Sequence, residues 1–253
     1  MFFQSSCCKS LIFLQVNLAS VPKLELHYDP WLLASITRFG ELMTALSAIG
    51  QNEREALLDG LTLLARIFWG PDASLCGDLC ESAQEILSQL TGLLSPPGPA
   101  AARDLIQHLG AYDNPAELCA QLAPAYVRLF VSDQGGVAAP LYHSCYQGEG
   151  LLMGTPAQEM ARRLEAAGLG LEQDSAEPPD HLAVELEYLI LLLEDGWSHD
   201  DPALLTEAGE FAGSFMLPWV EGFLARLANE TSSRFYPLSA ELLTALLARL
   251  GRP

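Results

Sequence analysis

The stretch AEPPDHLAVELEYLILLLEDG, residues 176–196, places an aspartate and a histidine between two prolines and a long apolar run. Prolines are common at a helix entrance, where the missing backbone N–H does no harm. The first turn of a helix has free backbone N–H groups, and these groups stabilise a carboxylate. Asp180 can therefore simply cap the helix that follows, or Asp180 and His181 together can hold a ligand.

A metal site is one alternative for this stretch. His181 and Glu185 are four residues apart, so a helix would place both side chains on one face. Imidazole and carboxylate are common metal ligands, but the pair would need a third ligand, for which His143 and His199 are the candidates of suitable type. A helical metal-dependent or redox enzyme that uses this pair and a cysteine therefore remains open, although we predict no metal or other cofactor.

A second stretch, PLYHSCYQGEGLLMG (140–154), carries hydroxyl groups at alternating positions. In extended backbone Tyr142, Ser144 and Tyr146 would all project to one side, as a binding surface requires. The alternative is a buried turn whose hydroxyls are satisfied by hydrogen bonds within the protein. This stretch alone identifies no chemistry.

The common signatures of enzymes are missing from the sequence. It contains no GxxxxGK[ST] phosphate loop, no HExxH, no GxSxG and no strand–GxGxxG–helix unit. These motifs therefore point to no common enzyme class.

Apolar residues recur at helical spacing along most of the chain, which predicts an all-α fold. The first predicted helix begins near Asn52 as its cap and ends at Gly70-Pro71. The connectors SPPGPA (95–100) and Gly168–Pro179 interrupt the pattern, and no convincing strand is present. The other predicted helices cover residues 75–94, 115–135, 157–168, 180–194, 202–218, 219–227 and 238–250.

The charge of the chain is strongly negative, with 32 acidic and 13 basic residues and a formal net charge of −19. Such a field repels phosphate backbones, so we predict no nucleic-acid binding. Acidity also keeps proteins soluble. However, no Lys or Arg lies between Arg163 and Arg226, and residues 172–210 carry twelve acids, so this segment suits a basic partner.

The six cysteines indicate no metal site, because Cys76 and Cys80 are one helical turn apart but no second pair completes a zinc site. A chain of this size does not need disulfides, so we expect reduced cysteines. The N-terminal segment resembles a signal peptide poorly, and no uncharged run reaches the roughly 18 residues that span a bilayer. We therefore expect a cytoplasmic protein without a membrane span.

Taken together, the two stretches resemble the TorD/DmsD family of redox-enzyme maturation chaperones, which also includes the more distant NarJ type. The segment YHSCYQGEGLLMG is similar to the family's Y-x-S-x-Y-like segment, and EPPDHLAVELEYL is similar to its E-P-x-D-H segment at the start of a helix. The stretches LLARIFWGPDASL, LPWVEGFLARL and RFYPLSAELL resemble other helices of the family. The residues that match the E-P-x-D-H segment and its helix are Glu177, Pro178, Asp180, His181, Glu185 and Leu186.

The resemblance implies an all-helical chaperone rather than an enzyme, with residues 45–253 as the chaperone domain and 1–44 as an N-terminal extension. Its partner would be the apo form of a molybdenum-cofactor oxidoreductase, bound through the twin-arginine leader until the cofactor is inserted. Exchange of the C-terminal helices through the connector 168–179 could produce a homodimer. The residues expected to bind the leader are Tyr142, Ser144, Tyr146, Glu177, Pro178, Asp180, His181 and Glu185.

A twin-arginine leader is chemically compatible with this sequence. Guanidinium groups bind paired carboxylates, which the acidic segment supplies, and the apolar part of a leader needs a groove between helices. Asp180 and His181 would then hold the leader directly or by shaping the connector. A helical scaffold without leader specificity is the remaining alternative.

Overall fold

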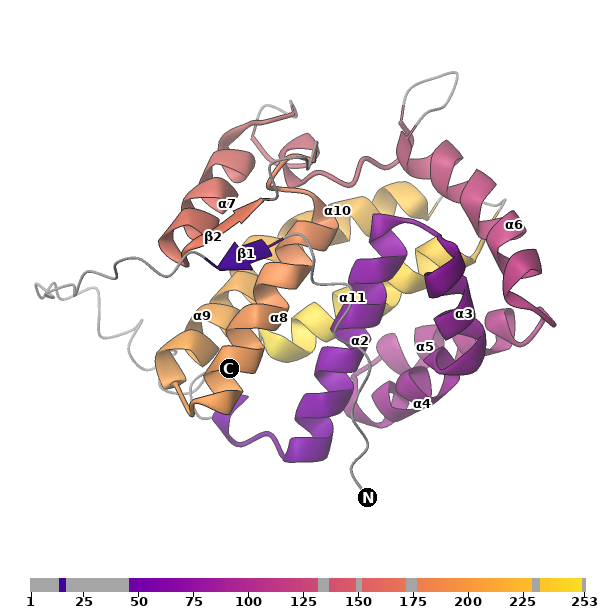
Figure 1. Cartoon of the computed structure of the whole chain (residues 1–253), viewed down its shortest axis with the longest axis horizontal. Helices are drawn as coiled ribbons and strands as arrows, with labels where there is room; N and C mark the ends of the chain where they lie inside the picture. The colour runs from indigo at the N-terminus through magenta and orange to yellow at the C-terminus, as the bar shows by residue number, and fades with distance from the viewer. Residues whose placement is uncertain are drawn as a thin grey trace, which may run out of the picture.

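The computed structural model describes residues 14–16, 46–131, 137–148, 152–171, 177–228 and 233–251. The predicted extension 1–44 therefore lies outside the described residues, apart from 14–16. Helices make up most of the described chain, and the predicted all-α class is confirmed (Figure 1). The α-helices are α2 (Gln51–Trp69), α3 (Ala73–Glu81), α4 (Ala83–Leu93), α5 (Gly98–Leu109), α6 (Pro115–Tyr126), α7 (Thr155–Ala166), α8 (Leu182–Ser198), α9 (Pro202–Glu210), α10 (Leu217–Leu227) and α11 (Phe235–Leu250).

Three shorter helical segments and two strands complete the fold. The segments η1 (Val127–Val131) and η3 (Phe211–Met216) are π-helical, and η2 (His143–Cys145) is a 3-10 turn. The strands β1 (Leu14–Val16) and β2 (Leu169–Leu171) pair antiparallel, so the expectation of no strand was wrong at these two short segments.

The helix α8 lies at the centre of the molecule, side by side with α2 (Figure 1). Most of its residues are buried, 13 of 17, which is typical of a helix packed on several sides. It also packs on α9, while α11 contacts α2, α5 and α10. The buried helix α8 carries two acidic residues, Glu185 and Glu187, whose side chains are 0% and 3% exposed.

Several predicted helix boundaries were wrong. Asn52 does not cap α2, because the helix already begins at Gln51, after Gly50, with no side-chain cap. The single helix expected over 75–94 is divided at Ser82 into α3 and α4, and the Asp72 carboxylate caps α3 by accepting a hydrogen bond from the Leu75 N–H.

Prolines account for the other differences in helix boundaries. The connector predicted at 95–100 contains the start of α5, because a proline in the first turn of a helix loses no hydrogen bond. Pro218 does not end a helix, since η3 carries the chain from α9 into α10. The π-helical segments η1 and η3 lie close to Pro124 and Pro218, which lack the N–H for an ordinary helical hydrogen bond.

A disulfide joins Cys76 of α3 to Cys119 of α6, so the expectation of reduced cysteines was wrong for this pair. The two residues are 43 positions apart, and only the packing of α3 against α6 brings them together. Cys80 is an exposed free thiol, and Cys145 is a partly buried one. Among the described helices, none combines the length and the apolar character needed to cross a bilayer.

Candidate functional site

The two stretches that were singled out in the sequence lie against each other. Tyr142 and His181 form an isolated antiparallel bridge, and the His143 N–H donates to the Asp180 carbonyl oxygen over 3.0 Å. The Asp180 carboxylate oxygen Oδ2 accepts from the Ser144 N–H over 2.8 Å. The segment 141–146 is therefore fastened to the start of α8 by both backbone and side-chain hydrogen bonds.

His181, rather than Asp180, caps α8. Its Nδ1 accepts a hydrogen bond from the Ala183 N–H over 3.2 Å, which fixes this nitrogen as the unprotonated one. Burial lowers the pKa of His181 to about 3, because a charged ring would lose its hydration. The alternative in which Asp180 caps the helix is wrong, since its carboxylate accepts a hydrogen bond from the neighbouring segment instead.

Glu185 lies at the centre of a buried polar cluster. Its Oε1 shares a hydrogen bond of 3.0 Å with His143 Nδ1, and its Oε2 accepts from Trp219 Nε1 over 2.9 Å. The His143 ring stacks on the Trp219 indole, with 5.2 Å between the ring centroids. Burial raises the pKa of Glu185 to about 7, although the hydrogen bonds from both rings oppose this shift.

The residues proposed as metal ligands do not converge on one site. His181 is occupied as a helix cap, Glu185 bonds to His143 and Trp219, and His199 lies at the opposite end of α8. Within the ranges that the structure describes, no group of three or more His, Cys, Asp or Glu side chains is placed to hold a metal ion.

The predicted site residues divide into a buried set and a partly exposed set. Ser144, Asp180, His181 and Glu185 are at most 3% exposed. Tyr142, Tyr146, Glu177 and Pro178 are partly exposed. Within the exposed set, the Tyr142 hydroxyl donates to Glu177 Oε2 over 2.7 Å. Tyr146 donates to the Pro140 carbonyl oxygen, and its ring lies under the Arg226 guanidinium. Only the partly exposed set can contact a partner in this conformation.

Trp69, at the end of α2, extends the site beyond the two sequence stretches. Its indole stacks on the His181 ring at 4.8 Å, and the Tyr142 ring meets the same imidazole edge-on. The Trp69 Nε1 donates to Glu187 Oε1 over 2.8 Å. The α8 helix thus positions Trp69 through one buried imidazole and one buried carboxylate.

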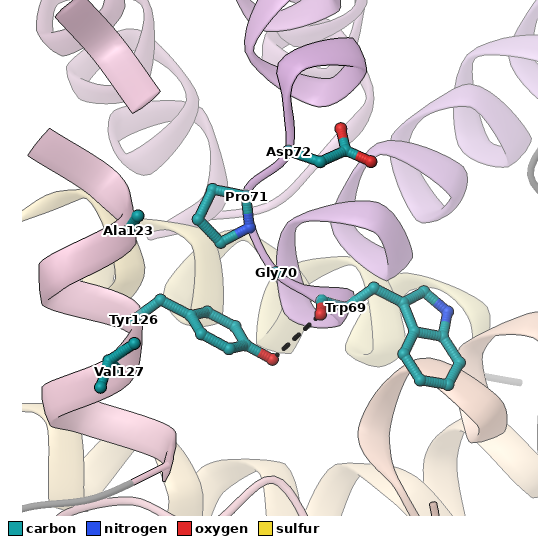
Figure 2. Close-up of a pocket in the computed structure, with 7 residues that line it drawn as sticks. All are labelled: Trp69, Gly70, Pro71, Asp72, Ala123, Tyr126 and Val127. Carbon is teal, nitrogen blue, oxygen red and sulfur yellow. Dashed lines mark hydrogen bonds between the residues drawn. The ribbon is translucent and has the colours of Figure 1, made fainter. Parts of the chain in front are cut away.

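A pocket of about 460 Å³ begins at Trp69 (Figure 2). The Tyr126 hydroxyl crosses it to donate to the carbonyl oxygens of Phe68 and Trp69, over 3.0 and 3.2 Å. Gly70 allows the turn, because its φ is +117° and a side chain there would meet the Tyr126 ring. The pocket is lined by Trp69, Gly70, Pro71, Asp72, Ala123, Tyr126 and Val127.

The Tyr126 ring faces this pocket, whereas the Trp69 indole and the Asp72 carboxylate are turned away from Tyr126 (Figure 2). The Asp72 carboxylate caps α3, and no basic side chain belongs to the lining in the described chain. Such a lining suits a cation with an apolar neighbour. The sequence did not indicate the pocket, because its walls come from the α2–α3 turn and α6, which are about 50 residues apart. The sequence feature that could have indicated the pocket is WGPD at 69–72, in which an aromatic residue ends one helix and an acidic residue precedes the next.

We expect Glu187→Gln to reduce the dependence of folding stability on pH. Burial raises the pKa of Glu187 to about 7, against the hydrogen bond from Trp69. Because this pKa is higher in the folded protein than in the unfolded chain, protonation stabilises the fold. The stabilisation is complete below the unfolded pKa of about 4.3 and is lost as pH rises through about 7. Gln imitates the protonated carboxyl. The loss of unfolding free energy between about pH 5 and about pH 8 should therefore shrink by about 1–3 kcal/mol.

Denaturant unfolding at both pH values measures this effect. Glu185 and His181 also contribute to the pH dependence of stability, because burial shifts both of their pKa values. Both residues are present in the wild type and in the variant, so the difference between the two proteins reports on Glu187. The control Glu210→Gln changes an exposed residue of α9 and should retain the wild-type dependence. An unchanged pH dependence in Glu187→Gln would show that the Glu187 carboxylate of the wild type is already ionised in the folded protein at about pH 5.

Comparisons with known proteins place the chain in a family. Residues 92–225 match the nitrate reductase delta subunit family. The chaperone protein TorD of Actinobacillus succinogenes is 31% identical over 208 residues, which cover 79% of this chain and 97% of that protein. TorD of Photobacterium profundum is 31% identical and covers 72% of this chain and 89% of its own length. TorD of Vibrio cholerae is 28% identical and covers 72% of this chain and 88% of its own length.

Among solved structures, a putative redox enzyme maturation protein from Archaeoglobus fulgidus is similar to this chain. It is 23% identical, the match covers 79% of this chain and 96% of that one, and the TM-score is 0.48. The family match spans more than half of the chain, and the TorD proteins match over most of their own lengths. The chain therefore belongs to the nitrate reductase delta subunit family and, within it, to the TorD-type chaperones.

Proposed function

We propose that the chain is a cytoplasmic maturation chaperone that binds the twin-arginine leader of an apo-molybdoenzyme, assists insertion of the molybdenum cofactor and delays export. The observation that carries this proposal is the acidic and aromatic surface formed by the Trp69–Tyr126 pocket and the neighbouring Tyr142–Glu177 pair. The family assignment supports the same role. No catalysed reaction is part of it.

Arginine is the side chain that this surface suits best. A guanidinium group forms forked hydrogen bonds to carboxylates and stacks on aromatic faces. The Glu177 carboxylate lies next to the Tyr142 ring, and the Tyr126 ring faces the pocket (Figure 2). One guanidinium group of a leader would find a carboxylate and a ring at Glu177 and Tyr142, and the other would find the face of Tyr126.

The charge of the surrounding chain favours the same partner. Residues 164–225 contain no Lys or Arg, and the partly exposed Glu177 at the entrance to α8 belongs to this stretch. Long-range attraction would steer a basic leader toward this face and would weaken as salt is added. Val127, an exposed residue that also lines the pocket, offers an apolar contact for the segment that follows the arginines.

In this proposal the buried residues of the family motif act by positioning. Asp180 fastens the segment 141–146 to α8, and His181 supports both Trp69 and Tyr142 through ring contacts. Their role is to shape the connector and the aromatic surface rather than to touch the leader. The exchange of C-terminal helices through the connector 168–179 stays a prediction, for which light scattering would reveal slowly exchanging monomer and dimer.

We expect Glu177→Gln to weaken binding of a synthetic twin-arginine leader peptide by at least about tenfold, because losing a charged partner in a partly buried contact costs about 2–5 kcal/mol. Gln keeps an oxygen that can accept the Tyr142 hydroxyl hydrogen bond, so thermal stability should remain unchanged. Calorimetric titration and thermal melting of the same samples measure both quantities.

The matched control is Glu210→Gln, which removes the same charge from an exposed position within the acidic segment. It should bind the peptide nearly as tightly as the wild type. Equal weakening in both variants would indicate attraction by total charge alone. No weakening in either would favour an apolar contact and a scaffold without leader specificity.

A further inference from the structure

The disulfide between α3 and α6 lies next to the pocket on both of its walls. Cys76 is four residues after Asp72, and Cys119 is four residues before Ala123, so each sulfur is one helical turn from a residue that lines the pocket. The Cys119 sulfur also lies 3.2 Å from the backbone carbonyl oxygen of Asp72. The disulfide is therefore part of the wall that holds the pocket residues in place.

Besides side-chain packing, a hydroxyl hydrogen bond and the disulfide join these walls. The Tyr126 hydroxyl bonds to the carbonyl oxygens of Phe68 and Trp69 at one end of the pocket. The disulfide joins α3 to α6 at the Asp72 end. A hydrogen bond can exchange with water, whereas the disulfide opens only by a redox reaction.

The two sulfur atoms differ in their access to solvent. Cys76 is completely buried, while Cys119 is partly exposed. A small or protein-bound dithiol reductant can therefore attack the Cys119 sulfur. The S–S bond breaks with Cys76 leaving as a thiolate that takes up a proton, and a mixed disulfide forms on Cys119. The second thiol of the reductant then attacks this bond, so the reductant becomes oxidised and Cys119 is released as a thiol.

We propose that this disulfide is a reversible redox lock on the pocket, closed by thiol–disulfide exchange with an oxidised dithiol, which is reduced as the bond forms, and opened by a reduced dithiol. The inference rests on the proposed function, because the pocket is the site assigned there to a leader arginine. The intact disulfide holds Asp72 and Ala123 at a fixed separation, so binding requires no ordering of the two walls. Reduction leaves α3 free to shift against α6, and the affinity for the leader falls by about fivefold or more, the usual range for coupled sites.

The experiment uses the full chain with Ser at the other cysteines, so that only the pair of interest can react. Thiol alkylation and mass measurement establish that the chain is oxidised before, and reduced after, treatment with dithiothreitol. A synthetic twin-arginine leader peptide is titrated into both forms, together with the peptide in which both arginines are Gln. The cysteines replaced in this background are Cys7, Cys8, Cys80 and Cys145.

The expected result is tighter binding of the twin-arginine peptide to the oxidised form, with the difference restored by reoxidation. A chain that also carries Cys76→Ser and Cys119→Ser should bind like the reduced form and ignore dithiothreitol. The comparison of the two redox forms of the parent chain remains decisive even if this variant does not fold.

Each of the following outcomes would overturn the proposed redox lock, and they differ in their consequence for leader binding. Equal affinity of both redox forms for the twin-arginine peptide, with weaker binding of the Gln peptide, removes the lock and leaves leader binding intact. No discrimination between the two peptides in either form overturns leader recognition, and the lock with it. Alkylation of Cys76 and Cys119 in the chain after oxidation would show that the disulfide does not form.

Discussion

Replacement of Glu185 by alanine is expected to destabilise the fold by about 3–5 kcal/mol, the usual loss when one member of a buried polar pair is removed. The side chain is 0% exposed and bonds to two rings, His143 and Trp219. Alanine would leave both ring nitrogens without their acceptor in a packed region and would add a cavity. The effect should be large because these partners come from the segment 141–146 and from α10, both of which pack on α8.

Chemical denaturation measures this loss. Glu185→Gln retains the volume and one acceptor, so it should cost less than the alanine variant. Glu221→Ala, an exposed change on α10, serves as the control and should stay within about 0.5 kcal/mol of the wild type. A loss below about 1 kcal/mol in Glu185→Ala would show that the cluster contributes little net stability, as can happen for buried polar groups.

Replacement of both leader arginines by glutamine is expected to weaken binding by about a hundredfold or more. One arginine would lose the Glu177 carboxylate in a partly buried contact, which costs about 2–5 kcal/mol, and the other would lose a cation–π contact with Tyr126 of about 0.5–2 kcal/mol. Glutamine retains the length and the hydrogen-bonding ability of the side chain but not its charge. Calorimetric titration at low and high salt measures both the loss and its electrostatic origin, because the advantage of the arginine peptide should shrink as salt rises.

Much of the fold could be predicted from the sequence, because long helices reveal themselves by periodic leucines. The helices α6, α8 and α11 followed from that spacing. The helix α5 was missed because Pro and Gly at its start resemble a connector, although prolines are tolerated in a first turn. The strand pair β1–β2 consists of three residues on each side, too few for alternation to show.

The candidate site could be predicted only in part. The two motifs were recognised by resemblance, but their mutual hydrogen bonds join residues about 36 positions apart, and no local pattern encodes such a contact. Asp180 was one candidate for the cap because aspartate is a good cap, yet packing gave that role to His181 and turned Asp180 toward Ser144. The pocket and the disulfide depend on how α3 meets α6, which sequence periodicity does not determine.

In the proposed complex the Glu177 carboxylate holds a guanidinium group of a twin-arginine leader. A double-mutant cycle tests this contact. Wild type and Glu177→Gln are each titrated with the leader peptide and with two further peptides, in each of which one of the two arginines is replaced by Gln. We expect a coupling of at least about 1.5 kcal/mol between Glu177 and one of the two arginines, the lower end for close charged pairs. If the losses of binding free energy are additive within about 0.5 kcal/mol for both arginines, Glu177 contacts neither of them, and the proposed contact with the leader is wrong.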